Sequence, residues 1–447
     1  MSRNRSNRRR APARHERGAA TLIVVMVLFF VVSMVAAYTN RNMLFEQRTS
    51  ANQYRSSQAL EAAEAGVEWA LSMLNHSRID ASCIASASST DTSFRERYLA
   101  IDALAGTMLP RTTSAGAELT PQCVFDPASA TWSCSCPADG APSVTAPTAP
   151  GTAPAFAIRV LRAPEGVGPL QPGVVRIESV GCTRLSADCL QFVGQGQVNE
   201  GRAVVSVLAA LAGRVNSVPV AALTSRGAVN VGGSLYNSQP GDSGVTVQAG
   251  GSVSSSIMAY TAAGSLPATS IIAGDTGLQV PAAAPYTASD RFFGSVFGIF
   301  PESFRLQQSA VRRTCAGAPC TAAVLRADIL MNPGRPIWID GNVNVNSGGD
   351  IGSAAAPVLL IVNGDLQFSV SGVTIHGLVY VRPVSPSTVW TTSGTGQVQG
   401  ALVVDGDVGT SGGANFPTVV YSSAALATLR SGTGSFVRVP SSWKDYQ

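Results

Sequence analysis

The sequence predicts an α+β protein with one long amino-terminal helix, a small antiparallel sheet and a larger carboxy-terminal all-β domain. Three observations support this fold class. An uncharged apolar run extends from Gly18 to Thr39, helical spacing of apolar residues continues to Leu74, and short Val, Ile and Leu runs separated by Gly, Asn and Asp follow. Only 13% of the residues are charged, against 45% hydrophobic. This composition excludes a highly charged disordered chain, a coiled coil and a cytosolic nucleic-acid binder.

Residues 1–18 form a basic leader. They contain seven arginines and one acid, Glu16, and so account for a charge of +6 in a chain whose net charge is +4. The remainder therefore carries a charge of −2. Because the basic character belongs to the leader, we expect no nucleic-acid partner for the folded part.

Residues 19–39 fit one transmembrane helix. About 20 apolar residues span the hydrocarbon core of a bilayer, and the positive-inside rule then places the leader in the cytoplasm and everything after Arg41 outside. The alternative is a cleaved secretory signal peptide, because Val35, Ala36 and Ala37 before Tyr38 satisfy the small-residue cleavage rule. The apolar run is longer than a usual signal-peptide core, which favours the transmembrane helix.

Residues 40–76 continue as an amphipathic helix. The segment has no proline and one glycine, Gly66. Apolar residues recur at three- and four-residue steps, and an acidic stripe lies beside them. The apolar positions are Leu60, Ala63, Val67, Ala70, Leu71 and Leu74, and the acidic positions are Glu61, Glu64 and Glu68. One continuous helix of about 55 residues, roughly 80 Å long, is the simplest account.

These residues carry a resemblance to a known family. A basic leader that ends in glycine, the run Thr21-Leu22-Ile23 and the amphipathic extension resemble the class III signal of type IV pilins and pseudopilins. More narrowly, residues 14–75 resemble the amino-terminal domain of PilX-type minor pilins. The resemblance implies a single-pass protein of the inner membrane with a periplasmic carboxy-terminal domain, which later enters a pilus fibre at the cell surface.

The resemblance also implies roles for individual residues. A prepilin peptidase would cut after Gly18 or after Ala19 and methylate the new amino terminus, at Ala19 or Ala20. Thr21, Leu22, Ile23 and Val24 would then pack among other minor and major pilins, with the small residues Ala36 and Ala37 closing the helix contacts. Major pilins usually carry a glutamate where this chain has Val24, which suits a subunit at a fibre tip; alternatively, Val24 simply packs in lipid.

Residues 77–212 are expected to form a pilin-like β domain. A short helix is predicted near residues 95–104, and strands are predicted at 155–162, 174–181 and 202–211. The proline-rich segment 137–154 is predicted to be a loop.

Residues 213–447 are expected to form a β-rich domain. Short apolar runs that end in Asn-Gly or Asp-Gly corners, such as residues 337–345, 359–368 and 401–408, favour a right-handed β-solenoid over a β-sandwich. Residues 281–330 interrupt the pattern and are expected to form an inserted loop or a lateral helix.

Eight cysteines in a chain that faces an oxidising compartment suggest disulfides. Cys182 with Cys189 and Cys315 with Cys320 are the natural local pairs. A bond between Cys134 and Cys136 is strained, which favours Cys83 and Cys123 each pairing with one of them. A zinc site at Cys123, Cys134 and Cys136 is a weaker alternative, because the usual ligand spacing is absent and no histidine is near. We expect no metal and no cofactor.

The sequence contains no HExxH motif, no P-loop and no dinucleotide-binding fingerprint, and we expect no enzyme. The competing hypothesis is a membrane-anchored or secreted β-solenoid that binds or cleaves glycans. Its candidate residues are five aspartates at glycine-rich corners, which also suit turn geometry and, more weakly, calcium: Asp340, Asp350, Asp365, Asp405 and Asp407. The favoured function is a minor pilin of a type IV pilus or a related secretion pseudopilus, which primes assembly, displays an adhesive β domain for a surface or glycan ligand, or does both.

Overall fold

The computed structural model describes residues 17–446, except 89, 103–106, 149–151, 164–170, 193–199, 240–241, 255, 262–268, 308, 384–388, 393–395 and 410–414. Of residues 17–20 and 446 it describes the backbone alone. The leader 1–16 lies outside the described residues. The chain divides into two compact units, residues 1–57 and residues 58–447.

Helix α1 (Arg17–Leu74) is continuous over 58 residues, as the sequence predicts. Its residues 21–57 are exposed throughout. In the second unit, residues 58–74 bury one face of the helix and expose the other. Ala59, Ala63 and Val67 are at most 2% exposed, whereas Glu61 and Glu68 lie on the exposed side. The predicted helical extension is therefore amphipathic over residues 58–74, whereas residues 40–57 are helical but bury no face, and the helix ends at Leu74 rather than at residue 76.

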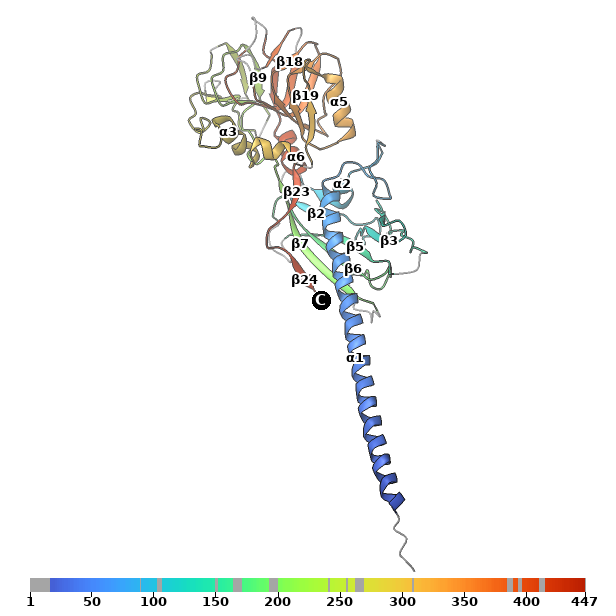
Figure 1. Cartoon of the computed structure of the whole chain (residues 1–447). Coiled ribbons are helices and arrows are strands. Elements are labelled where there is room, and N and C mark those ends of the chain that lie inside the picture. Colours follow the sequence, from blue (N-terminus) through green and yellow to red (C-terminus); the bar gives the residue numbers. More distant parts are fainter. Residues whose placement is uncertain are drawn as a thin grey trace, which may run out of the picture. The chain divides into compact units, whose positions relative to one another are not determined.

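An antiparallel sheet packs against this part of α1 (Figure 1). Its strand order is β23-β7-β6-β5-β3-β4, and β24 also pairs with β7. The strands are β3 (Gln122–Asp126), β4 (Thr131–Ser135), β5 (Ala155–Arg162), β6 (Val174–Cys182), β7 (Arg202–Ala212), β23 (Ser435–Arg438) and β24 (Lys444–Tyr446). The three strands predicted between residues 155 and 211 are present almost residue for residue. The described part of the proline-rich segment 137–154 contains neither helix nor strand.

The predicted short helix is shorter than expected. Helix α2 (Phe94–Tyr98) begins with a capping box in which Ser93 and Glu96 satisfy each other's backbone amides. It ends because Leu99 is extended and starts the hairpin β1 (Leu99–Ile101) and β2 (Met108–Pro110). A helix to residue 104 was therefore the wrong prediction.

The second β region is built from parallel strands. A first segment contains β8 (Leu223–Ser225), β9 (Gly233–Asn237), β10 (Val247–Ala249), β11 (Ile257–Thr261) and β12 (Ile271–Ile272). A second segment contains β13 (Val311–Thr314), β14 (Cys320–Thr321), β15 (Ile337–Asp340), β16 (Val343–Val345), β17 (Val358–Asn363), β18 (Leu366–Phe368), β19 (Val373–Val381), β20 (Val389–Thr391), β21 (Gly396–Val404) and β22 (Thr418–Tyr421). We call both segments together the parallel stack.

Consecutive strands of the parallel stack pair in parallel at similar offsets, from 19 residues between β17 and β19 to 26 residues between β13 and β15. Val343 pairs with Leu366 and Leu366 with Val389, and Asn342 bonds to Asp365 at a separation of 23 residues. Parallel pairing at similar offsets is what a solenoid requires, whereas a β-sandwich is antiparallel. The right-handed coil stays a prediction. The core is apolar and includes Trp338, Leu360, Phe368, Val379 and Leu402, none more than 2% exposed.

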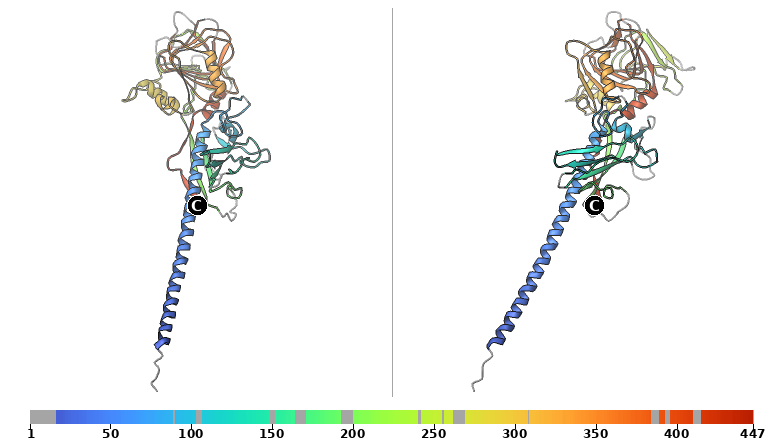
Figure 2. Two further views of the ribbon diagram at one scale, coloured as in Figure 1. Left: turned by 45° about the vertical axis from the view of Figure 1, so that its right-hand side comes forward. Right: turned by 90° about the vertical axis from the view of Figure 1, so that its right-hand side faces the viewer.

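The chain builds this stack out of order. The first segment ends at β12, and the second starts at the far end with β13 and returns until β21 pairs with β8 and β22 with β9. Figure 2 shows the yellow-green and the orange-red strands in one body. Between the segments lie α3 (Ala288–Phe297) and α4 (Pro301–Arg305), and α5 (Ala322–Met331) follows β14. The predicted interruption at residues 281–330 therefore contains lateral helices, but its second half was assigned wrongly, because β13 and β14 belong to the parallel stack.

The boundaries need one correction. We expected residues 213–447 to form a separate domain, but residues after β22 return to the antiparallel sheet. Helix α6 (Ser423–Gly432) leads into β23, and Phe436 of β23 pairs with Leu211 of β7. The parallel stack is therefore an insertion between β7 and β23, joined to the sheet by two chain segments.

Candidate assembly helix and its joint to the β domains

In the first unit, the described helix is exposed throughout, and between Thr21 and Thr39 it is apolar and uncharged on every side. Side chains from Leu22 to Phe45 include Phe29 at 73% exposure and Met34 at 66%. Among the described residues, the part of α1 from Thr21 is the one helix long and apolar enough to cross a membrane, with a mean hydropathy of 2.6 in its most apolar stretch of 18 residues. A helix that is apolar on all sides requires lipid or other apolar helices around it.

The residues predicted to act in assembly all lie on this surface. Thr21, Leu22, Ile23 and Val24 begin the run, with Leu22 at 61%, Ile23 at 63% and Val24 at 59% exposure, and Ala36 and Ala37 are also exposed. The backbone at Gly18, Ala19 and Ala20 is helical, and their side chains lie outside the described residues. No carboxylate occurs between Gly18 and Glu46.

In the second unit, α1 and the antiparallel sheet touch through small residues. Gly181 of β6 faces Ala59 and Ala63, and a methyl group there would overlap the Ala59 carbonyl oxygen and the Ala63 amide. Gly66 faces the sheet in turn, where a methyl group would overlap Ser179 Oγ. The helix and the sheet backbone therefore approach as closely as glycine and alanine permit.

The carboxy-terminal end of α1 is joined to the chain that returns from the parallel stack. The side chain of Asn75 donates to the carbonyl of Phe436 at 2.8 Å and accepts from its amide at 2.7 Å. Both contacts are buried. The side-chain amide of Asn75 thus makes the two backbone hydrogen bonds that a neighbouring strand would otherwise make to Phe436 of β23. Sequence analysis missed this contact, because 361 residues separate its partners.

Arg95 forms the second part of this joint. Its guanidinium donates to the carbonyl of Leu74 at 3.1 Å, of Gly432 at 2.7 Å and of Gly434 at 3.0 Å, and lies 4.7 Å from the ring centre of Phe436. Leu74 is the last residue of α1 and Gly432 the last of α6, so one cation satisfies two helix carboxy termini. Burial lowers the pKa of Arg95 to about 10, the largest effect on it.

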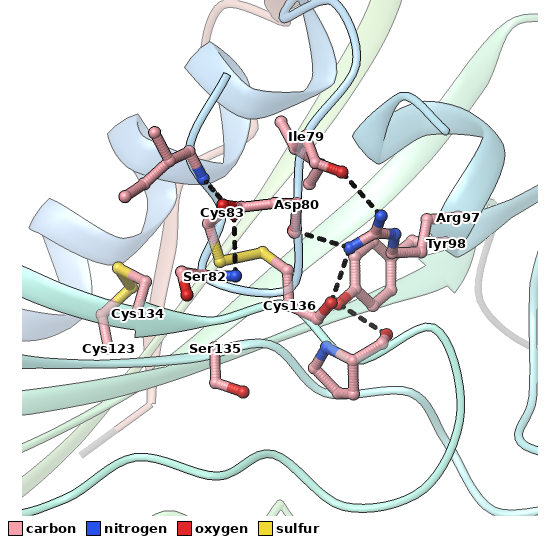
Figure 3. Close-up of a disulfide and its surroundings, with 12 residues drawn as sticks. Ile79, Asp80, Ser82, Cys83, Arg97, Tyr98, Cys123, Cys134, Ser135 and Cys136 are labelled. Atoms are coloured by element: carbon pink, nitrogen blue, oxygen red, sulfur yellow. Dashed lines mark hydrogen bonds between the residues drawn. A yellow bond between two sulfur atoms is a disulfide. The ribbon is translucent and has the colours of Figure 1, made fainter. Parts of the chain in front are cut away.

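The disulfides fix the loops around this joint. Cys83 pairs with Cys136 and Cys123 with Cys134, so Cys134 and Cys136 are not bonded to each other, as the sequence analysis favoured. Beside the first bond, the buried Arg97 donates to the carbonyls of Ile79, Asp80 and Cys136 at 2.7 to 2.8 Å (Figure 3).

The remaining predicted pairs also form, Cys182 with Cys189 and Cys315 with Cys320. The described residues hold no group of three or more His, Cys, Asp or Glu side chains that could bind a metal ion. The cysteines proposed as a zinc alternative are instead divided between two disulfides.

The five aspartates of the glycan hypothesis lie at corners of the parallel stack and contact neighbouring backbone or side chains, and two of them, Asp405 and Asp407, flank Gly406 at one corner. Asp340 accepts from Trp338 Nε1 at 2.8 Å, Asp350 from the Thr374 amide at 3.0 Å and Asp407 from the Ala228 amide at 2.8 Å. The backbone of Asp365 donates to Asn342 Oδ1. The Trp338 contact lies within one strand, whereas Asp340 also accepts from Asn363 Nδ2 of the next strand at 3.2 Å, and the contacts of Asp350, Asp365 and Asp407 likewise join adjacent strands or corners. This is a structural use of the aspartates.

Asp405 is the most buried of the five, with a side chain at 0% exposure. It accepts from Arg226 Nε at 2.6 Å, Ser289 Oγ at 2.5 Å and Tyr380 Oη at 3.2 Å. Burial, and then the charge of Asp405, raise the pKa of Tyr380 well above its usual value. The cluster joins β21, the first segment and α3, so it holds the parallel stack together.

The family comparison matches most of α1. Residues 17–68 match the family model described as PilX N-terminal. Among solved structures, the competence-associated pilin ComZ from Thermus thermophilus is 11% identical, over 88% of this chain and 97% of that chain, with a TM-score of 0.23, which supports no further argument. No curated protein matches the chain. Residues 17–68 are therefore similar to the amino-terminal segment of PilX-type pilins.

Proposed function

We propose that this chain is a minor pilin of a type IV pilus. Its apolar helix holds the precursor in the inner membrane, prepilin peptidase cuts after Gly18 or Ala19 and methylates the new terminus, and the helix then packs among other pilins. The observation that carries the proposal is the PilX-type match on a helix whose residues 21–57 are exposed on every side. Exchange of lipid contacts for helix contacts in a fibre buries the same surface.

The large insertion favours a place at the fibre tip. The parallel stack leaves the sheet after β7 and returns before β23, so two chain segments tether it rather than one. The joint at Asn75 and Arg95 couples its return segment to α1. A domain of this bulk fits at the tip, where it is displayed for adhesion or contacts the first subunits to prime assembly.

The role proposed is structural and not catalytic. In support, Asp340, Asp350, Asp405 and Asp407 already accept hydrogen bonds from their own fold, and Asp405 is fully buried. Glycan cleavage needs a pair of carboxylates that reach the same sugar. A glycan could still be the ligand of the displayed domain.

The test is incorporation into fibres in the native host. Sheared and purified fibres from wild-type cells are expected to contain this chain at low abundance, and immunogold label is expected at fibre ends. A variant with Gly18→Trp is expected to stay uncut in the inner membrane and to be missing from fibres, while Gly348→Trp is the matched control. Gly348 lies at an exposed bend outside the helix, and nothing lies within 4 Å of a Cβ added there. A chain that is secreted alone, or fibres without it, would contradict the proposal.

A further inference from the structure

Three arginines form one row on the exposed part of α1 within the first unit. Arg41, Arg48 and Arg55 are seven residues apart, so each lies about 20° around the helix and about 10 Å along it from the one before. All three are exposed. We call them the arginine row; it is about 21 Å long.

The row has no intrahelical counterion. Glu46 is the one acid between Gly18 and Leu60, and it stands five residues from Arg41 and two from Arg48. Ion pairs on a helix need a spacing of three or four residues, and Glu46 lies about 140° around the helix from Arg41. Among the described residues no ion pair of the row is found; Arg41 instead stacks on Phe45, 5.6 Å from its ring centre.

Lipid headgroups account for one of the three arginines. The apolar run ends at Thr39, and the headgroup layer adds about 6 Å on each side of the hydrocarbon core. Arg41 lies at this depth, but Arg48 is about 10 Å and Arg55 about 21 Å farther along the helix. A partner for the whole row must therefore be a rod that runs beside α1 outside the membrane.

A pilin helix with an acidic face has the required geometry. Carboxylates repeated every seven residues stand at the same spacing of about 10 Å as the arginines. The exposed acidic stripe of α1 itself illustrates the pattern, because Glu61 and Glu68 are seven residues apart. When two helices carry opposite charges at the same interval, all the charges face each other in one axial position only, and a shift along the helix moves them out of contact.

We infer that the arginine row binds the acidic face of the helix of a neighbouring, different pilin and sets the axial stagger between the two helices. The inference rests on the proposed function, since a subunit present in few copies has other pilins as neighbours. Three contacts over about 21 Å resist sliding better than apolar surface, which is nearly uniform along a helix.

The test is photocrosslinking of the full chain in its host. A benzophenone amino acid replaces Asn52, which lies between Arg48 and Arg55 on the row's side, or Ser50, which lies on the opposite side of the helix and is the matched control. From position 52 we expect crosslinks to a helical segment of another pilin that carries carboxylates. Arg48→Glu is expected to reduce their yield about tenfold, the effect of about 1.4 kcal/mol, while Arg48→Lys retains them.

The outcomes separate this inference from the proposed function. If both positions crosslink to pilins and Arg48→Glu has no effect, the inference about the arginine row is wrong, but the proposal that the chain is a minor pilin stands. Crosslinks from position 52 to lipid or to a second copy of this chain would also overturn it. A chain that crosslinks to no pilin from either position and is missing from fibres would instead refute the proposed function.

Discussion

Replacement of Gly181 by alanine is expected to destabilise the fold, although alanine is normally the better residue in a strand. Glycine within a strand costs about 0.5 to 1 kcal/mol relative to alanine, so an unhindered substitution would stabilise the protein by that amount. Here the new methyl group would overlap the backbone of Ala59 and Ala63 and lie 2.9 Å from Ala63 Cα. Because backbone atoms cannot rotate away, the helix must move. We expect this movement to cost an amount at the upper end of the usual range for overpacking, which is about 1 to 3 kcal/mol. We expect a net loss of about 2 kcal/mol.

The assay is urea unfolding of the purified full chain in detergent, followed by tryptophan fluorescence. Trp69 of α1 reports on the contact directly, because its ring lies 5.6 Å from that of Phe156 in the sheet. Gly432→Ala is the control, since the last residue of α6 has nothing within 4 Å of its added methyl group and should lose no stability. A Gly181→Ala protein as stable as wild type would refute the close packing of helix and sheet.

Three further predictions concern the joint and the parallel stack. Arg95→Met is expected to lower the free energy of unfolding by about 3 kcal/mol, because three carbonyls lose a charged donor. Limited proteolysis of this variant should then cut the chain near Gly434. Arg95→Lys is expected to restore little of the lost stability. Asp405→Asn is expected to lower the free energy of unfolding by about 3 kcal/mol, because Arg226 loses its buried partner. An unchanged urea midpoint would show that the Asp405 cluster does not stabilise the parallel stack. Burial raises the pKa of Tyr421 to about 12. The neutral hydroxyl of Tyr421 therefore contributes its full stabilisation below the unfolded pKa of about 10, and this stabilisation is lost as the pH rises from 10 to 12. Tyr421→Phe should reduce this alkaline loss of stability, measured as the urea midpoint at pH 9 and pH 11.5.

Local sequence patterns predicted the elements that depend on local interactions. The helix from Arg17 to Leu74 follows from apolar spacing and the lack of proline, and β5, β6 and β7 follow from runs of β-branched residues. Loop length predicted the pairs Cys182–Cys189 and Cys315–Cys320, and strain argued against a Cys134–Cys136 bond, but which of these two cysteines pairs with Cys83 and which with Cys123 could not be predicted. The parallel stack was favoured by its Gly, Asn and Asp corners, but the order in which the chain fills it depends on contacts between β8 and β21, nearly two hundred residues apart.

Contacts between distant residues could not be predicted in this way. Strand β23 has four residues, and nothing in Ser435–Arg438 indicates that it pairs with β7 rather than with the preceding strands. The joint was missed for the same reason, since Asn75 and Arg95 meet residues more than 300 positions later. A capping box at Ser93 and Glu96 marked the start of α2, but it could not show that the arginine between them would cap two other helices.

The mass of the amino-terminal peptide of the mature protein, purified from its own host, tests the central claim most directly. The account predicts a methylated terminus at Ala19 or Ala20, with the apolar helix retained. An unmethylated terminus at Tyr38 would show removal of the helix by a signal peptidase and would contradict assembly into a fibre.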